Sequence, residues 1–160
     1  MSSWQLGTIN QADELDPILA IEQRSFRWPW GRLSFEGELS CQNACNYVVK
    51  YSADSAGEQV IAYAFFRQAA DELHLLKIAV SPAWRGKGIA TRLLQRCFKI
   101  AATQGMTSVH LEVRPSNIPA VELYLKLGFE VIGRRYKYYA DTKEDALLMM
   151  KTLAILIING

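Results

Sequence analysis

An apolar strand followed by a strongly amphipathic helix constrains this chain more than any other feature of its sequence. The strand is expected at 72–80, where it is stopped by Ser81-Pro82, and the helix is expected at 89–103. Apolar residues recur along the helix at three- and four-residue spacing, as a face that packs on a core requires. These residues are Ala90, Leu93, Leu94, Cys97, Phe98 and Ala101. A strand that feeds such a helix predicts a layered α/β domain.

The loop between these two elements predicts a phosphate site. Gly86 and Gly88 allow backbone N–H groups to turn toward one point, and the helix N-terminus adds partial positive charge there. Arg85 and Lys87 add full charges. A phosphate or pyrophosphate therefore suits the loop. The alternative interpretation is a plain strand-to-helix turn that happens to contain glycine.

Two nucleotide-binding motifs can be compared with the same loop. The phosphate loop of nucleoside triphosphatases ends in Gly-Lys-Ser/Thr, but Lys87 is followed by Gly88, so that class is excluded. The dinucleotide fingerprint G-x-G-x-x-G is half matched, with Thr91 at its third glycine. Glu112 lies at the distance expected of a ribose-binding acid, but it falls inside a strand pattern. Dinucleotide binding therefore remains the weaker alternative.

The rest of the chain completes a mixed α/β pattern without repeats or a linker. Strands are expected at 4–9, 47–51, 60–67, 72–80, 109–113, 130–138 and 146–152. Helices are expected at 13–24, 34–39, 89–103 and between a cap at Asn117 and a stop at Gly128. We predict a single α/β (α+β mixed-sheet) domain over 1–152, followed by an apolar tail, 153–160, that continues a strand or packs on a partner.

Composition excludes several classes of function. A net charge of +2 over 160 residues is too small for a protein that coats nucleic acid. Three cysteines without a CxxC pair, together with two histidines, argue against a metal site. The six-residue apolar run 153–158 is too short to span a membrane. The odd cysteine count and the lack of a signal peptide predict a cytoplasmic protein.

Two polar side chains are candidates for chemistry. The strand 109–113 alternates so that His110, Glu112 and Arg114 share one face, which is either solvated or functional. Tyr124 lies on the apolar face of the last helix and is either a core tyrosine or a catalytic one. If Gly128 is the residue just past the helix C-terminus, Phe129 should pack near Leu123 or Tyr124.

The sequence from Val80 to Ala90 resembles the acetyl-CoA-binding motif of the GCN5-related N-acetyltransferases (GNAT). The core of that motif, Gln/Arg-x-x-Gly-x-Gly/Ala, is matched by Arg85, Gly88 and Ala90. The segments 111–117 and 123–129 look like the next two blocks of the family.

More narrowly, the chain resembles the ribosomal-protein-alanine acetyltransferase (RimI) branch over about residues 15–152. The segments that carry this likeness are 21–24, Pro29-Trp30, Arg134-Arg135 with Tyr138-Tyr139, and 144–146. The chain departs from the branch in lacking a proline after the tyrosine pair and in its apolar tail.

The resemblance implies a GNAT-like fold, with a mostly antiparallel central sheet flanked by helices, and acetyl-CoA as cosubstrate without a metal. It implies that the backbone of one strand segment pairs with the pantetheine arm, that the glycine loop holds the pyrophosphate, and that Asn117 contacts the cofactor further along. The cofactor-binding residues so implied are Ile78, Ala79, Val80, Arg85, Gly86, Lys87, Gly88, Ile89, Ala90, Thr91 and Asn117.

The same resemblance implies transfer of acetyl to the N-terminal α-amine of a protein, with a ribosomal protein as the best candidate. Glu112 would act as general base and Tyr124 as general acid. Trp28, Trp30, Tyr138 and Tyr139 would form the walls of an acceptor groove, or else serve ordinary packing. The alternatives are a small-molecule amine acetyltransferase and a non-catalytic acyl-CoA-binding module. The presence of Glu112 and Tyr124 speaks against the second.

Overall fold

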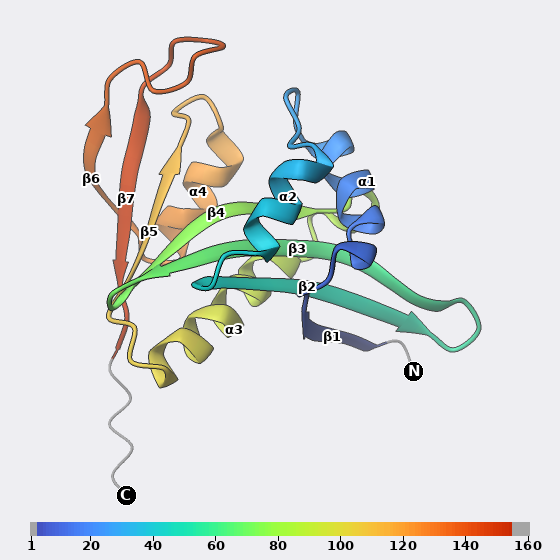
Figure 1. The fold of residues 1–160 in the computed structure, drawn as a ribbon. Coiled ribbons are helices and arrows are strands. Elements are labelled where there is room, and N and C mark those ends of the chain that lie inside the picture. Colours follow the sequence, from blue (N-terminus) through green and yellow to red (C-terminus); the bar gives the residue numbers. More distant parts are fainter. Residues whose placement is uncertain (1–2, 155–160) are drawn as a thin grey trace, which may run out of the picture. The chain divides into compact units, whose positions relative to one another are not determined.

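The computed structural model describes residues 3–154, and its elements are shown in Figure 1. The chain forms two compact units. The first unit comprises residues 1–67 and 77–94, and the second comprises 68–76 and 95–160. The predicted apolar tail lies outside the described residues from 155 onward.

The strands confirm the expected mixed, mostly antiparallel sheet. They are β1 (Ser3–Thr8), β2 (Ala44–Ala53), β3 (Gly57–Ala69), β4 (Glu72–Val80), β5 (Ser108–Val113), β6 (Glu130–Arg135) and β7 (Ala146–Thr152), and hydrogen-bonded neighbours follow the order β1-β2-β3-β4-β5-β7-β6. The β4–β5 pair is parallel, whereas β1–β2, β2–β3, β5–β7 and β6–β7 are antiparallel.

The helices are α1 (Asp16–Ser25), α2 (Arg32–Leu39), α3 (Ile89–Thr103) and α4 (Ile118–Lys126), with short 3-10 turns at Ala12–Glu14 and Pro82–Trp84. Several predicted boundaries were wrong by one to three residues. The strands expected at 47–51 and 60–67 extend further at both ends, as β2 and β3, and the helix expected from residue 34 begins at Arg32. Two further differences have a local cause. The helix expected from residue 13 begins at Asp16, because Pro17 occupies the first turn and the preceding residues form their own 3-10 turn. The strand expected to reach residue 138 ends at Arg135, since Lys137 takes a positive φ of 47°.

In the first unit, α1 and α2 lie on one face of β2 and β3 (Figure 1). The helices direct apolar side chains onto the strands, and the resulting core is rich in aromatic rings. Its members include Ile18, Ile21, Phe35, Val48, Tyr63 and Phe65. Phe35 meets Phe65 edge-on at 5.2 Å between ring centroids. This core fixes both ends of the loop that joins α1 to α2.

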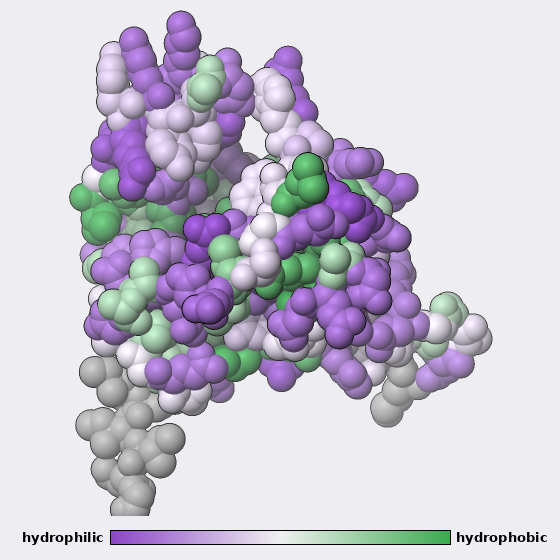
Figure 2. Space-filling model, viewed as in Figure 1, coloured by the Kyte–Doolittle hydropathy of each residue, from purple (hydrophilic) through white to green (hydrophobic). Residues whose placement is uncertain are grey.

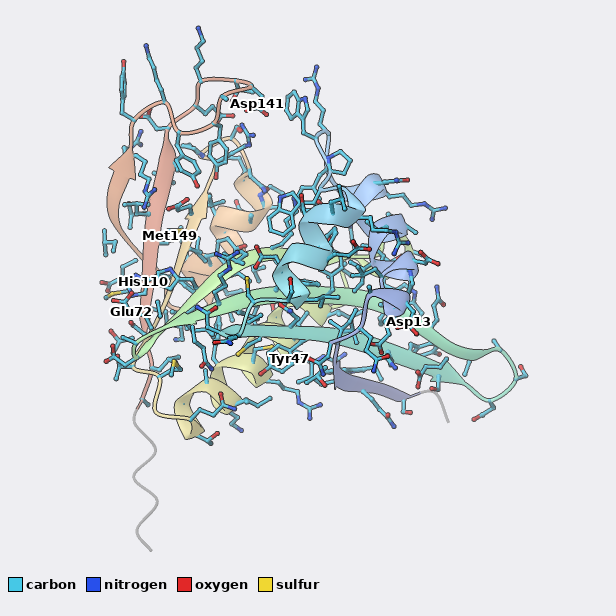
Figure 3. All side chains as sticks on the ribbon, viewed as in Figure 1. Asp13, Tyr47, Glu72, His110, Asp141 and Met149 are labelled. Carbon is cyan, nitrogen blue, oxygen red and sulfur yellow. The ribbon has the colours of Figure 1, made fainter. Side chains whose placement is uncertain are left out.

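In the second unit, the end of α4 follows the prediction. Gly128 has a φ of 93°, and Phe129 returns against Tyr124 at 5.6 Å between ring centroids. Phe129 also meets Phe98 of α3 at 5.8 Å, and Met149 of β7, labelled in Figure 3, is fully buried. Packing therefore fixes the ring of Tyr124 within this unit.

Hydrophilic residues cover most of the face in Figure 2, and hydrophobic colour appears there only in small areas. Among residues 3–154, no helix is both long enough and apolar enough to cross a membrane.

Candidate active site

The glycine loop of the first unit has the backbone that a phosphate site needs. Gly86 and Gly88 both adopt positive φ, at 75° and 74°, which side chains other than glycine rarely tolerate. The carbonyl of Gly88 accepts the first α-helical bond of α3, from Arg92 at 3.1 Å. A shallow pocket follows the loop, lined by Val80, Trp84, Arg85, Gly86, Gly88, Ile89, Ala90 and Thr91. A loop of this backbone and lining could hold a phosphate group, and the pyrophosphate site stays a prediction.

The two cations of this loop have different environments. The Arg85 side chain braces the loop, because its Nε donates to the carbonyl of Val80 at 3.0 Å and its NH2 donates to Ser25 Oγ at 2.9 Å. Lys87 is exposed, with its Nζ 5.0 Å from the ring centroid of Trp84. Both cations are exposed, and Arg85 is the one whose hydrogen bonds brace the loop.

The ladder between β4 and β5 is short. In the second unit it joins three residues of each strand, from Glu72↔Ser108 to His74↔His110. The next two residues of β4 in this unit, Leu75 and Leu76, lie beyond that ladder, although β5 continues to Val113. A parallel pair that stops early can leave backbone groups for another partner.

Glu112 lies on β5 and is partly exposed, with 28% of its side chain accessible. Its Oε1 is 3.2 Å from Nε of Arg135 on β6. The hydroxyl of Tyr138 also donates to this carboxylate, and that bond is the main reason why the pKa of Tyr138 is raised. The alternation along β5 is confirmed, since Leu111 and Val113 are buried.

Tyr124 is almost fully buried on α4, at 6% exposure. Burial, with a smaller contribution from Tyr139, raises the pKa of its phenol above the ordinary value of 10.0. The phenol therefore stays protonated at physiological pH, as a proton donor must. At the other end of α4, Asn117 caps the helix by accepting from the Ala120 N–H at 3.3 Å. The predicted cap is confirmed.

The tyrosine pair lies in the loop between β6 and β7, residues 136–145, which we call the β6–β7 loop. Arg114 at the end of β5 donates to both oxygens of Asp141, at 2.9 and 2.7 Å, and to Thr142 at 2.8 Å. Its guanidinium also lies 3.8 Å from the ring centroid of Tyr139. Figure 3 marks Asp141 in this loop. Half-burial is the main reason why the pKa of Tyr139 rises to about 12.

The aromatic loop, residues 26–31 between α1 and α2, holds Trp28 and Trp30. Trp28 is half exposed, whereas the ring of Trp30 packs edge-on against Phe35 at 5.4 Å. The main-chain N–H of Trp30 donates to the buried carboxylate of Glu22 at 2.9 Å. Ordinary packing was one of the two roles that the sequence left open for Trp30, and this packing is present. Trp28 has the more accessible ring of the two.

Sequence reasoning missed the polar partners of these loops. Glu22 falls at the apolar spacing of α1, beside Ile18 and Ile21, and Lys77 interrupts an apolar strand. A charge at a core position is the signal that could have identified this pair. Arg114 was placed on the face of Glu112, but nothing in its spacing predicted that it would hold the β6–β7 loop.

Across residues 3–154, no group of three or more His, Cys, Asp or Glu side chains could hold a metal ion. The two histidines stack at 5.2 Å between ring centroids, and His74 Nε2 lies 3.0 Å from Glu72 Oε2. Figure 3 shows Glu72 beside His110 at this edge of the second unit.

The comparisons with known proteins agree with this geometry. The model of the Acetyltransferase (GNAT) family matches residues 15–129. The ribosomal protein bS18-alanine N-acetyltransferase of Salmonella typhimurium is 33% identical over 144 residues, which cover 89% of this chain and 93% of the relative. The enzyme of that name from Escherichia coli is 31% identical over 148 residues, covering 90% and 96%.

A solved structure extends the likeness to the fold. The crystal structure of the ribosomal-protein-S18-alanine N-acetyltransferase from Escherichia coli superposes with a TM-score of 0.83 at 27% identity, covering 99% of each chain. The chain therefore belongs to the GNAT acetyltransferase family. It is an acetyl-CoA-dependent N-acetyltransferase of the RimI type, which confirms the motif-based identification.

Proposed function

We propose that the enzyme acetylates the N-terminal α-amine of a protein, with the ribosomal protein S18 as first candidate. The relatives of more than 30% identity that act on the alanine of this ribosomal protein support this acceptor. The odd number of cysteines, three in the chain, is compatible with a reducing cytoplasm, where we place the reaction.

The acetyl donor is assigned to the end of β4 and to the glycine loop. Ile78–Val80 would pair with pantetheine, and Arg85–Thr91 would hold the pyrophosphate. The positive φ of Gly86 and Gly88 and the short β4–β5 ladder support this assignment. The Asn117 side chain is engaged as a helix cap, so a cofactor contact there falls to its backbone or to a shared bond.

Glu112 and Tyr124 would handle the protons of a direct transfer. The amine nitrogen forms a bond to the thioester carbon, and the carbon–sulfur bond breaks. Glu112 receives the proton of the amine, directly or through one water, and Tyr124 gives a proton to the departing thiolate. An α-amine has a pKa of about 7.7–8, so much of it is neutral near physiological pH and little is asked of the base. The observation that carries this assignment is the buried Tyr124 side chain, whose ring packs against Phe129 at 5.6 Å between ring centroids.

The test combines peptides of varied first residue with two conservative variants. Glu112→Gln and Tyr124→Phe should each lower kcat by about 10²–10⁴, with the affinity for acetyl-CoA, measured by titration calorimetry, nearly unchanged. Glu130→Gln, at an exposed carboxylate of β6, is the matched control. Wild-type turnover in both catalytic variants would show that the roles are wrongly assigned.

The choice of acceptor is tested separately. If polyamines or aminoglycosides are turned over rapidly while every peptide is poor, the acceptor is a small-molecule amine. If acetyl-CoA binds but no amine is acetylated, the chain is a binding module.

A further inference from the structure

The carboxylate of Glu22 is fully buried, and three donors share it. Oε1 receives the Trp30 main-chain N–H at 2.9 Å and lies 2.7 Å from Nζ of Lys77. Oε2 accepts the hydroxyl hydrogen of Tyr63. A carboxylate is costly to remove from water, and a folded chain keeps one in its core only when it is paired and hydrogen-bonded. Nothing in the acetyl-transfer chemistry uses this group.

The cation of this pair also contacts the aromatic loop. The Lys77 side chain is only 12% exposed, and its Nζ lies 3.9 Å from the ring centroid of Phe26 and 4.9 Å from that of Trp30. Burial lowers the pKa of Lys77, against the opposing effect of Glu22. The loop is therefore held twice, by its main chain on the carboxylate and by two rings on the ammonium group.

The Glu22–Lys77 pair also lies next to a proposed cofactor segment in the sequence. Lys77 directly precedes Ile78–Val80, the stretch of β4 assigned to pantetheine. One turn after Glu22 on α1, Ser25 accepts from the Arg85 guanidinium of the glycine loop at 2.9 Å. The last turn of α1 is thus bonded to the glycine loop through Arg85 and to Lys77, the residue just before the segment assigned to pantetheine. Through Glu22 it is also bonded to the aromatic loop.

We propose that Glu22 is a positioning residue that fixes the aromatic loop for the acceptor and links it, through Lys77, to the cofactor strand. The proposal rests on the proposed function in one respect, namely that the aromatic loop receives the acceptor. Loss of the carboxylate releases the Trp30 N–H and leaves Lys77 without its anion. The loop then samples other positions, and the acceptor binds less well.

The kinetic test compares two variants that touch the same carboxylate. Glu22→Gln should raise the KM for the acceptor peptide by about tenfold or more, while the Kd for acetyl-CoA changes less than about threefold. Tyr63→Phe removes the donor to Oε2 but keeps the Trp30 and Lys77 contacts, so it should leave both constants near wild type. Equal rises of peptide KM in the two variants, or a rise in neither, would overturn the positioning role.

A second measurement needs neither turnover nor the Glu22 variant. Amide hydrogen exchange of the wild-type enzyme is followed with and without CoA. CoA should slow exchange at residues 86–91 and, through Lys77 and Glu22, also at the Trp30 amide, and Tyr63→Phe should keep both effects. Slowing at 86–91 with no change at Trp30 overturns the link. Failure of the peptide assay alone would instead count against the proposed acceptor.

Discussion

Two aromatic loops of this enzyme are anchored in opposite ways. The aromatic loop of the first unit, 26–31, is tied to one ion pair, formed by the fully buried Glu22 and the mostly buried Lys77. The β6–β7 loop of the second unit, 136–145, is tied to Arg114, whose side chain is 27% exposed. The first anchor gathers its contacts on a single ion pair. The second spreads them over a carboxylate, a hydroxyl and a ring.

The difference predicts how each loop fails. A buried pair is little screened, and removal of either partner leaves an uncompensated charge in the core. The partly exposed Arg114 is screened by water, so each of its contacts is weak and none is indispensable. Removal of one partner should therefore be enough to release the first loop from its position. The second loop should become more mobile by a small step with each contact that is removed.

The largest expected effect is that of Lys77→Met. This change leaves the Glu22 carboxylate buried without its cation, and it should lower the free energy of unfolding by about 3–5 kcal/mol. Urea unfolding measures it. Lys99→Met, at an exposed position of α3, is the control and should stay within about 0.5 kcal/mol of wild type. A loss below about 1 kcal/mol for Lys77→Met would mean that the buried ion pair contributes no more stability than the partly exposed contacts of Arg114.

A double variant separates stability from positioning. Replacing a whole buried ion pair by apolar residues is often neutral or stabilising, so Glu22→Leu with Lys77→Met should regain most of the stability lost by Lys77→Met. The Trp30 N–H nevertheless remains without the Glu22 carboxylate that accepts its hydrogen bond, and the KM for the peptide should stay high. A double variant that recovers both stability and peptide KM would show that the pair serves the core alone.

Arg114→Ala should have a smaller effect. It removes the bidentate pair with Asp141 and the contact with Tyr139, and the expected loss of stability is about 1 kcal/mol, since the groups are partly hydrated. Amide exchange should accelerate within 137–145 and not elsewhere. Arg134→Ala, which removes a more exposed arginine 3.5 Å from Asp145, serves as control. A global loss of protection would place Arg114 among the structural residues of the core.

Much of the fold followed from periodicity. The bounds of β4, α3 and β7 were predicted to the residue. β4 and α3 each carry a regular apolar pattern with a clear stop, at Ser81-Pro82 and at Gly105. The start of α1 and the end of β6 were not predicted, since a 3-10 turn and the positive φ of Lys137 depend on local geometry that periodicity does not encode. Residue 137 is a lysine, which gives no turn signal.

The candidate site divides in the same way. The glycine loop, the Asn117 cap and the Tyr124–Phe129 contact follow from short-range rules and were predictable. The pairs Glu22–Lys77 and Glu112–Arg135 join residues far apart in sequence. Only the tertiary structure brings such charges together, so the sequence could offer single charged residues at apolar or strand positions but not their partners.

Acid should produce the smallest effect, and only at the exposed anchor. The hydroxyl of Ser116 donates to Glu144 Oε1 at 2.8 Å and its N–H donates to Oε2 at 3.3 Å, and these bonds lower the pKa of Glu144 below 4.5. A carboxyl whose pKa is lowered by folding stabilises the fold above its unfolded pKa, and this contribution is lost as the pH falls through the lowered value. Carbon-13 NMR of the Glu144 carboxyl should therefore show a midpoint below 4.5, with faster exchange of the Ser116 amide past it. Ser116→Ala should move the midpoint upward, because the largest cause of the shift is gone. If the midpoint is the same in the variant, the serine does not hold this end of the β6–β7 loop, and the second anchor reduces to Arg114.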